Sequence, residues 1–178
     1  YVRMIKHFVQ ACLEYSDEQL RRHLDIYIWF ADRLTEAKEN GWIAYEYIPA
    51  EMRTSFGKLM ESLDEFIVYR NSRKEVLDGF CENIGSFIIF GCGYYGRKTY
   101  YAMKKRDYRG IGFMDNSSDL QGKEMYGISI ISPDKIPDIP ADTGYLIANE
   151  KHAAEIQNQI ITGNSRAKVL AVELEMLL

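Results

Sequence analysis

The sequence predicts an α/β protein, in which a helical N-terminal region precedes a small domain with a mostly parallel sheet of four to five strands. Two observations support this. Up to about residue 83, apolar side chains recur at steps of three and four, the period of an amphipathic helix. From residue 86 onward, short apolar runs alternate with helical stretches or turn residues, as in α/β units. We therefore expect a helical region over residues 1–84 and a sheet domain over residues 85–178.

The first helices are predicted from their apolar faces and their start and stop residues. One face over residues 5–12 is apolar. Ser16 and Gln19 then have the spacing of a capping box, in which two side chains satisfy backbone groups at a helix start. Apolar residues at helical spacing follow over residues 20–34, and Gly41 provides a stop. We expect two helices here.

A third helix is predicted over residues 52–66, where the same stepping recurs. Ser72 and Glu75 again have the spacing of a capping box, and an apolar stretch over residues 76–81 follows them. The sequence therefore predicts that a separate fourth helix begins at Ser72.

The strands are predicted from apolar runs of four residues bounded by turn residues or helical stretches. These runs are Phe87–Phe90, Ile111–Met114, Ile128–Ile131, Tyr145–Ala148 and Val169–Val172.

The most informative motif follows the first of these strands. Gly91, Gly93 and Gly96 form a G-x-G-x-x-G pattern, and a helix is expected over residues 94–106. In a phosphate-binding turn, the first glycine allows the tight turn, the second lets the backbone approach a phosphate, and the third lets the helix pack on the strand. Asp115 ends the next predicted strand, where a carboxylate can accept hydrogen bonds from ribose hydroxyls. This layout predicts a Rossmann-like domain with a nucleotide-type ligand.

Residues inside this turn allow two interpretations each. Cys92 precedes a helix N-terminus, where the pKa of a thiol can be lowered, so it is either a reactive thiol or a small buried side chain. Tyr94 and Tyr95 either stack on a base or sugar or pack against the rest of the domain. Arg97 and Lys98 oppose the helix dipole unless an anionic ligand lies nearby, or they simply point into solvent.

Polar residues also follow a later strand. Asn149 and His152 come after the run that ends at residue 148. In open α/β sheets this end of the strands lines the ligand crevice. We therefore include Asn149 and His152 among the candidate ligand-binding residues, with His152 either an acid/base group or a bystander in a helix start.

Composition limits the classes of function. The net charge of −4 argues against broad nucleic-acid binding, and we expect no nucleic-acid partner. No apolar run reaches the length of a membrane span, and three widely spaced cysteines suit the cytoplasm and form no metal-ligand cluster. We expect no metal. The sequence has no P-loop, no G-x-S-x-G elbow and no D-x-D motif, so the catalytic residues are unknown.

The order Phe-Gly-Cys-Gly-Tyr-Tyr-Gly, Gly-Ile-Gly-Phe-Met-Asp-Asn and Gly-Lys-Glu-Met-Tyr-Gly-Ile-Ser-Ile-Ile-Ser-Pro resembles a known domain type. It is similar to the N-terminal nucleotide-sugar-binding domain of PglD-type sugar acyltransferases, and comparable domains accompany FkbM-type methyltransferases. The resemblance implies that the three glycines bind a phosphate or pyrophosphate and that Asp115 and Asn116 lie near the ribose or base. The catalytic hexapeptide repeats of those acyltransferases are absent here, so acyl transfer is not inferred.

These residues lead to one hypothesis and two alternatives. The first is a nucleotide- or nucleotide-sugar-binding module of a transferase in bacterial surface-polysaccharide biosynthesis, with a UDP-sugar or an NAD-type nucleotide as ligand. Its helical region loosely resembles the C-terminal extension of family-two glycosyltransferases, and if Tyr1 marks a cut in a longer chain, a catalytic domain is expected upstream. The alternatives are an interaction module that docks a partner or a second copy through Trp29 and Phe30, and a small NAD-binding redox protein that uses Cys92.

Overall fold

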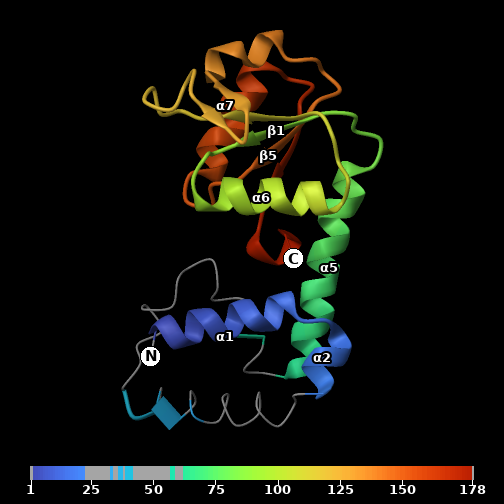
Figure 1. Cartoon of the computed structure of the whole chain (residues 1–178), viewed down its shortest axis with the longest axis vertical. Coiled ribbons are helices and arrows are strands. Elements are labelled where there is room, and N and C mark those ends of the chain that lie inside the picture. Colours follow the sequence, from blue (N-terminus) through green and yellow to red (C-terminus); the bar gives the residue numbers. More distant parts are fainter. Residues whose placement is uncertain are drawn as a thin grey trace. The chain divides into compact units, whose positions relative to one another are not determined.

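This computed structural model describes residues 2–22, 33, 36–37, 39–41, 57–58 and 62–177. The chain divides into two compact units, residues 1–74 with residue 178, and residues 75–177. We call the first the helical unit and the second the α/β unit, and each is described by itself (Figure 1). The division lies inside a helix, and the expected boundary between residues 84 and 85 stays a prediction.

The α/β unit has the alternating order that the sequence predicts. The final part of helix α5 (Leu63–Cys81) opens this unit. Its further elements are β1 (Phe87–Phe90), α6 (Tyr94–Lys105), β2 (Ile111–Met114), β3 (Glu124–Met125), β4 (Ile128–Ile131), η3 (Pro133–Asp138), β5 (Gly144–Ile147), α7 (Ala153–Gly163), β6 (Lys168–Ala171) and η4 (Leu174–Leu177). All five apolar runs named above form strands, within one residue of their expected bounds.

The sheet has the order β3-β4-β2-β1-β5-β6. All pairs are parallel except β3 with β4. The described residues thus contain six strands, one more than the upper expectation of five, because the two-residue β3 folds back as a hairpin onto β4. Without β3, the five parallel strands have the order 3-2-1-4-5 of a Rossmann fold, whose direction of winding reverses between β1 and β5.

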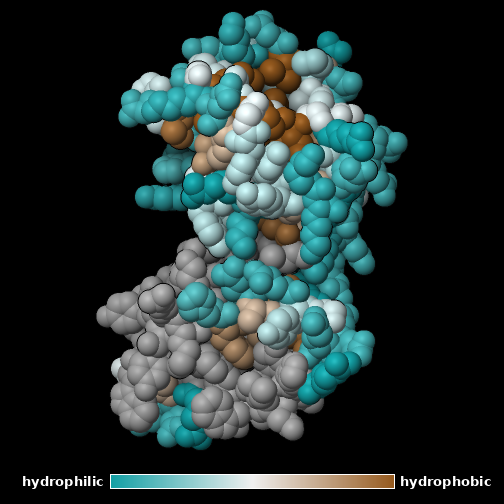
Figure 2. All heavy atoms as spheres, viewed as in Figure 1, coloured by the Kyte–Doolittle hydropathy of each residue, from teal (hydrophilic) through white to brown (hydrophobic). Residues whose placement is uncertain are grey.

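Helices cover both faces of this sheet (Figure 1). On one face, Ala102 and Met103 of α6 pack with Phe87, Ile89 and Phe113, together with the end of α5 and η4. On the other, α7 and η3 pack over the alternate residues of the same strands, which are Ile88, Phe90, Met114, Tyr145 and Ile147. Because successive strand residues point to opposite faces, a sheet covered twice needs the continuous apolar strands seen in the sequence. Figure 2 shows brown side chains lying between teal and pale ones in this unit.

The helical unit contains α1 (Val2–Glu14), α2 (Asp17–Arg22) and the first part of α5. The predicted capping box before α2 is confirmed. The amide of Gln19 donates to Ser16 Oγ at 3.2 Å, and the amide of Ser16 donates to Gln19 Oε1 at 2.9 Å. Most of the predicted helices over residues 20–34 and 52–66, with Trp29 and Phe30, lies outside the described residues.

The prediction of a separate helix beginning at Ser72 is wrong. α5 is one helix of 19 residues, and Ser72 lies in its interior, where its hydroxyl donates to the carbonyl of Tyr69 at 2.7 Å. A serine hydroxyl satisfied in this way no longer caps an amide. The cap lies instead at Ser62, whose Oγ accepts from the amide of Glu65 at 3.0 Å.

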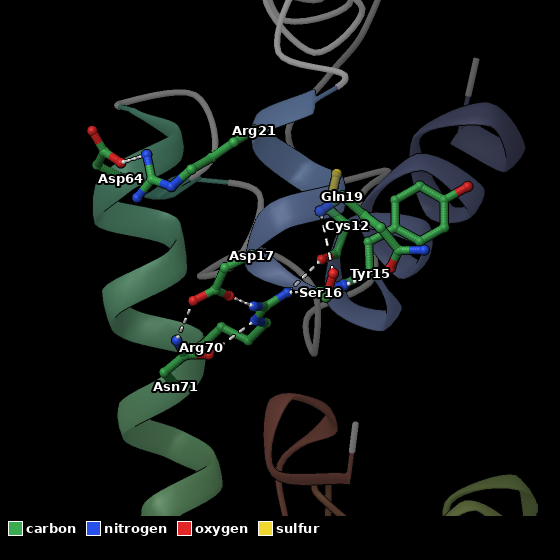
Figure 3. A network of polar contacts seen from close by, with 9 residues as sticks. All are labelled: Cys12, Tyr15, Ser16, Asp17, Gln19, Arg21, Asp64, Arg70 and Asn71. Atoms are coloured by element: carbon green, nitrogen blue, oxygen red, sulfur yellow. Dashed lines mark hydrogen bonds and ion pairs between the residues drawn. The ribbon is translucent and has the colours of Figure 1, made fainter.

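The buried Arg70 organises the helical unit, and we call its contacts with Cys12, Tyr15, Asp17 and Asn71 the Arg70 cluster (Figure 3). Arg70 is 1% exposed. Its Nη1 donates to the carbonyls of Cys12 at 3.0 Å and Tyr15 at 2.6 Å, at the C-terminal end of α1, and its Nη2 pairs with Asp17. Burial lowers the pKa of Arg70, and Asp17 opposes this shift. The guanidinium therefore satisfies carbonyls that a helix end leaves without intrahelical partners.

Candidate functional site

The candidate site lies where β1, β2 and β5 end. The amide of Gly91 donates to the carbonyl of Met114 at 2.8 Å, and the amide of Ala148 donates to the carbonyl of Phe90 at 2.8 Å. These bonds align the loops that leave the three strands, at the point where the sheet reverses its winding. In open α/β sheets, this is where ligands bind.

The first and third glycines are required by the fold itself. Gly91 has a φ of +109°, and a Cβ there would lie 2.9 Å from the carbonyl oxygen of Ala148. A Cβ at Gly96 would lie 1.9 Å from the carbonyl oxygen of Gly91, which is far inside van der Waals contact. These two glycines therefore allow the tight turn and the close approach of α6 to β1.

The second glycine, Gly93, has no such requirement. Its φ of −77° is accessible to every residue type, and a Cβ there would meet no protein atom within 4 Å. Gly93 is exposed and is the N-cap of α6, and it supplies no side-chain hydrogen bond to the helix. The first amides of a helix have no intrahelical acceptor and attract anions. The backbone around Gly93 thus faces open space at the start of a twelve-residue helix.

Asp115 lies against the glycine turn, which we define as residues 91–96. Its Oδ2 accepts from the amide of Cys92 at 2.7 Å, and its Oδ1 accepts from the amide of Ser117 at 2.8 Å. The structure thus brings together two site residues that lie 23 positions apart. The amide of Cys92 is bonded to Asp115 and is therefore not among the amides of the turn that a ligand could use.

The thiol of Cys92 is not activated. Its side chain is buried at 8% exposure, and Sγ lies 3.7 Å from the carbonyl oxygen of Met114. Burial, together with the negative charge of Asp115, raises the pKa of Cys92 to about 12. Of the two interpretations of Cys92, a reactive thiol or a small buried side chain, the second fits the structure.

The two tyrosines of the turn have different surroundings. Tyr95 is half-buried and packs against the hydrophobic core on the α6 face of the sheet. Tyr94 is 46% exposed, its ring lies edge-on to that of Tyr95 at 5.6 Å, and Lys98 Nζ lies 5.9 Å from its ring centroid. Only Tyr94 presents a large exposed ring at the start of α6.

The remaining predicted residues form local hydrogen bonds at the same sheet edge. Asn149 Oδ1 accepts from the amide of His152 at 3.2 Å, and His152 Nδ1 lies 3.1 Å from Glu155 Oε2. Asn116 Oδ1 accepts from Gln159 Nε2 of α7 at 3.1 Å. Asn149 lies beside the turn, since its Cβ would be 3.7 Å from a Cβ built on Gly91.

Sequence reasoning missed two contributors, Ser117 and Gln159. The amide of Ser117 orients Asp115, and an acid followed two residues later by a backbone donor is the Asx-turn pattern, so Ser117 could have been found. Nothing in the sequence indicates that Gln159 reaches Asn116. Within residues 62–177 and the other described segments, no group of His, Cys, Asp or Glu could hold a metal ion, and no helix is long and apolar enough to cross a membrane.

Comparisons with known proteins find a family profile and several solved structures. A family profile described as C2185-like, N-terminal, matches residues 84–170. No curated protein matches the sequence. Among solved structures, the crystal structure of RSP, a Rex-family repressor, is 14% identical with a TM-score of 0.41, covering 90% of this chain and 88% of that chain.

Two further crystal structures of RSP match at the same level. RSP in complex with β-NADH is 14% identical with a TM-score of 0.39, covering 90% of this chain and 89% of that chain. RSP with β-NAD+ and operator DNA is 12% identical with a TM-score of 0.41, covering 90% and 88%. At these identities the likeness concerns the fold alone. The comparisons give no support to the narrower resemblance to PglD-type or FkbM-associated proteins, or to a polysaccharide transferase.

The expectation of no nucleic-acid partner is corrected on this finding, since one matching structure contains operator DNA. The physical weakness of that expectation is its use of net charge. A total of −4 sums the whole chain and says nothing about local clusters of cations.

Proposed function

We propose that the α/β unit binds a nucleotide through its phosphates at the glycine turn, with a dinucleotide of the NAD type as the first ligand class. The observation that supports this most directly is Gly93. The fold needs glycine at positions 91 and 96, whereas at position 93 neither φ nor neighbouring atoms require it. A glycine without a structural requirement at an uncapped helix start is what close approach of a phosphate would require.

Asp115 would bind the ribose. An ionised carboxylate has about four acceptor positions, and the amides of Cys92 and Ser117 use one on each oxygen. Each oxygen therefore keeps capacity to accept from a ribose hydroxyl. The two amides already fix the orientation of the Asp115 carboxylate, so ligand binding would not have to order this side chain. A 2′-phosphate at this place would be repelled, which favours NAD over NADP.

A nucleotide sugar is the alternative ligand, because a UDP-sugar presents the same diphosphate and ribose diol to the same groups. A role in surface-polysaccharide biosynthesis would rest on the sequence resemblance alone. A redox role through Cys92 is disfavoured, because a thiol with a pKa of about 12 is almost entirely protonated near neutral pH.

Calorimetric titration of the full chain with NADH, NAD+, NADPH and a UDP-sugar tests the proposal. We expect NADH or NAD+ to bind more tightly than NADPH. A preference for the UDP-sugar would keep the site and change the ligand class. No binding by any of the four at millimolar concentration would contradict the proposal.

Gly93→Asp is the variant that separates ligand binding from folding. An aspartate at the N-cap can accept from amides of the first turn of α6, so we expect unchanged or slightly higher stability. The same carboxylate would occupy the phosphate position and repel the ligand, so affinity should fall at least about tenfold. Gly79→Asp is the matched control, because Gly79 is also exposed and a Cβ there meets no atom within 4 Å. Equal affinities in the two variants would refute the assignment of the phosphate site.

A further inference from the structure

A second exposed surface of the α/β unit lies along α6 and the turn between β3 and β4. Tyr126 stacks on Tyr100 with ring centroids 4.6 Å apart and an interplanar angle of 9°. Tyr101 meets Tyr126 edge-on at 5.3 Å. Tyr101 is 57% exposed and Tyr126 is 42% exposed, so two aromatic rings of this group lie open to solvent.

Tyr126 occupies a backbone conformation that tyrosine rarely adopts. Tyr126 and Gly127 form the two-residue connection between β3 and β4, with φ values of +56° and +75°. Two positive φ angles in a hairpin turn favour Asn-Gly or Asp-Gly, so tyrosine here is less stable than asparagine would be. The conformation of the turn therefore does not account for a tyrosine at the tip of the hairpin.

Cations surround these rings. Arg97, Lys104 and Lys105 are exposed and lie four residues before, three after and four after Tyr101, on the same side of α6. The pKa of Tyr126 is raised, mainly by a hydrogen bond with Tyr101, and the positive charge of Arg97 opposes this shift.

These charges are not neutralised by neighbours. α6 contains no Asp or Glu, and within the part of the chain that the structure describes, Arg97, Lys104 and Lys105 form no ion pair, whereas the adjacent Arg106 pairs with Asp78 at 2.8 Å. We call Arg97, Tyr101, Lys104, Lys105 and Tyr126 the tyrosine–cation face. Over α6, Figure 2 shows pale and teal spheres, as tyrosines and cations give, and not an apolar patch.

We propose that the tyrosine–cation face binds single-stranded nucleic acid. Proteins that bind single strands combine cations that follow the phosphates with aromatic rings on which bases stack, and this face has both within three helical turns. A duplex keeps its bases stacked inside, out of reach of exposed rings, and an acidic protein segment would need the cations but not the open tyrosines. The combination therefore favours an unpaired strand.

Fluorescence anisotropy tests this proposal with the full chain and a labelled oligothymidylate or oligouridylate of about 12 nucleotides. Tyr101→Ala should weaken binding at least about fivefold, the smallest effect expected for a lost stacking contact. Arg97→Gln and Lys105→Gln should each reduce the slope of log affinity against log salt by about 0.7, the value for one phosphate contact on a single strand.

Tyr126→Asn is the most discriminating variant, because it suits the turn better while removing the ring. We expect little change in stability, because the gain at the turn offsets the lost stacking on Tyr100, and we expect weaker oligonucleotide binding. Lys135→Gln is the charge-matched control, since Lys135 pairs with Asp138 in η3, on the opposite face of the sheet from α6.

Three outcomes would overturn the proposal. One is no binding at low salt. Another is binding that the tyrosine variants leave unchanged and that polyglutamate displaces equally well, which would identify a general polyanion surface. The third is that Gly93→Asp loses oligonucleotide binding while Tyr101→Ala keeps it, which would assign the strand to the glycine turn instead. Retained oligonucleotide binding in Gly93→Asp would keep this proposal independent of the nucleotide site.

Discussion

The Arg70 cluster and the glycine turn differ in how they leave the backbone groups at helix ends. In the helical unit, the buried guanidinium of Arg70 donates hydrogen bonds to two carbonyls at the end of α1. Ser16 and Gln19 cap the start of α2 (Figure 3). In the α/β unit, α6 begins at an exposed glycine with no side-chain cap. In the helical unit, side chains form hydrogen bonds with the backbone groups at the helix ends. In the α/β unit, no side chain caps the first amides of α6.

This difference separates structural polar groups from candidate binding groups. Both regions contain a charged side chain bonded to backbone, namely Arg70 and Asp115. Arg70 is 1% exposed and has partners on every side, so it has little capacity for a ligand. Asp115 is only partly buried and retains acceptor positions beside open space at Gly93. Unused hydrogen-bonding capacity next to free volume, rather than charge alone, identifies the site.

The largest expected loss of stability from a substitution is in the Arg70 cluster. Arg70→Met removes the guanidinium and leaves the carbonyls at the end of α1 without their donor. Breaking a buried pair by removing one partner costs about 3–5 kcal/mol. Because the Asp17 side chain is 47% exposed and can be solvated, we expect about 3 kcal/mol, the lower end of that range. Urea denaturation followed by circular dichroism measures the loss.

The exposed pair of Arg21 with Asp64 provides the control. Its N–O distance is 2.7 Å, but the two side chains are 58% and 73% exposed. Arg21→Gln should therefore cost less than about 1 kcal/mol. Equal losses in Arg70→Met and Arg21→Gln would show that burial does not decide the contribution of Arg70. Neither variant should alter nucleotide affinity if that site lies in the α/β unit.

Two glycines of the turn, Gly96 and Gly93, give the next effect. In Gly96→Ala, a Cβ placed 1.9 Å from a backbone oxygen forces α6 away from β1, and we expect a loss of stability of at least about 1–3 kcal/mol. In Gly93→Ala, no atom obstructs the new methyl group, so the loss of stability should be about 0.5 kcal/mol, from weaker capping. Nucleotide affinity should fall in both.

Thermal unfolding of both variants, with and without NADH, tests this contrast. A stability of Gly96→Ala equal to that of Gly93→Ala would contradict the different roles assigned to the glycines.

The sequence predicted the strands better than the helix starts. A run such as Phe87–Phe90 is apolar at every position because both faces of the sheet are covered, and that property is local and visible. The pattern S-x-x-E, in contrast, occurs at both Ser62 and Ser72. Which serine caps a helix depends on whether the chain continues as a helix before it, and α5 runs through Ser72 without interruption.

The candidate site was predicted in its residue types more fully than in its bonding. Spacing alone identified Gly91, Gly96 and Asp115. It could not reveal that Asp115 takes the amide of Cys92 or that the resulting charge raises the pKa of that thiol, because both depend on how β1 and β2 end side by side. The sequence therefore left two interpretations of Cys92 open, a reactive thiol or a buried side chain, and the choice between them needs the folded structure.

Near neutral pH the smallest effect is expected from the buried thiols and Tyr145, whose contributions show only in the pH dependence of the α/β unit. Burial is the main cause that raises the pKa of Cys92 to about 12, of Cys81 to about 11 and of Tyr145 to about 12. Among the described residues, the hydroxyl of Tyr145 has no hydrogen-bond partner. An unfolded thiol loses its proton near pH 9, so above that pH the unfolded state binds fewer protons than the folded state. Stability contributed by these groups is complete below about pH 9 and decreases as pH rises toward the folded pKa values, by at most about 1.4 kcal/mol per pH unit for each group.

Cys92→Ala isolates one of these contributions. Urea denaturation between about pH 8 and pH 11 should give a smaller loss of stability with pH in Cys92→Ala than in the unsubstituted chain. Arg70 lies in the helical unit and keeps its positive charge over this range, since a guanidinium is not deprotonated in proteins. The Arg70→Met variant should therefore lose stability by the same amount at both ends of the range. Identical pH slopes for Cys92→Ala and the unsubstituted chain would mean that the thiol is not buried against Asp115, and the bonding assigned to the glycine turn would have to be revised.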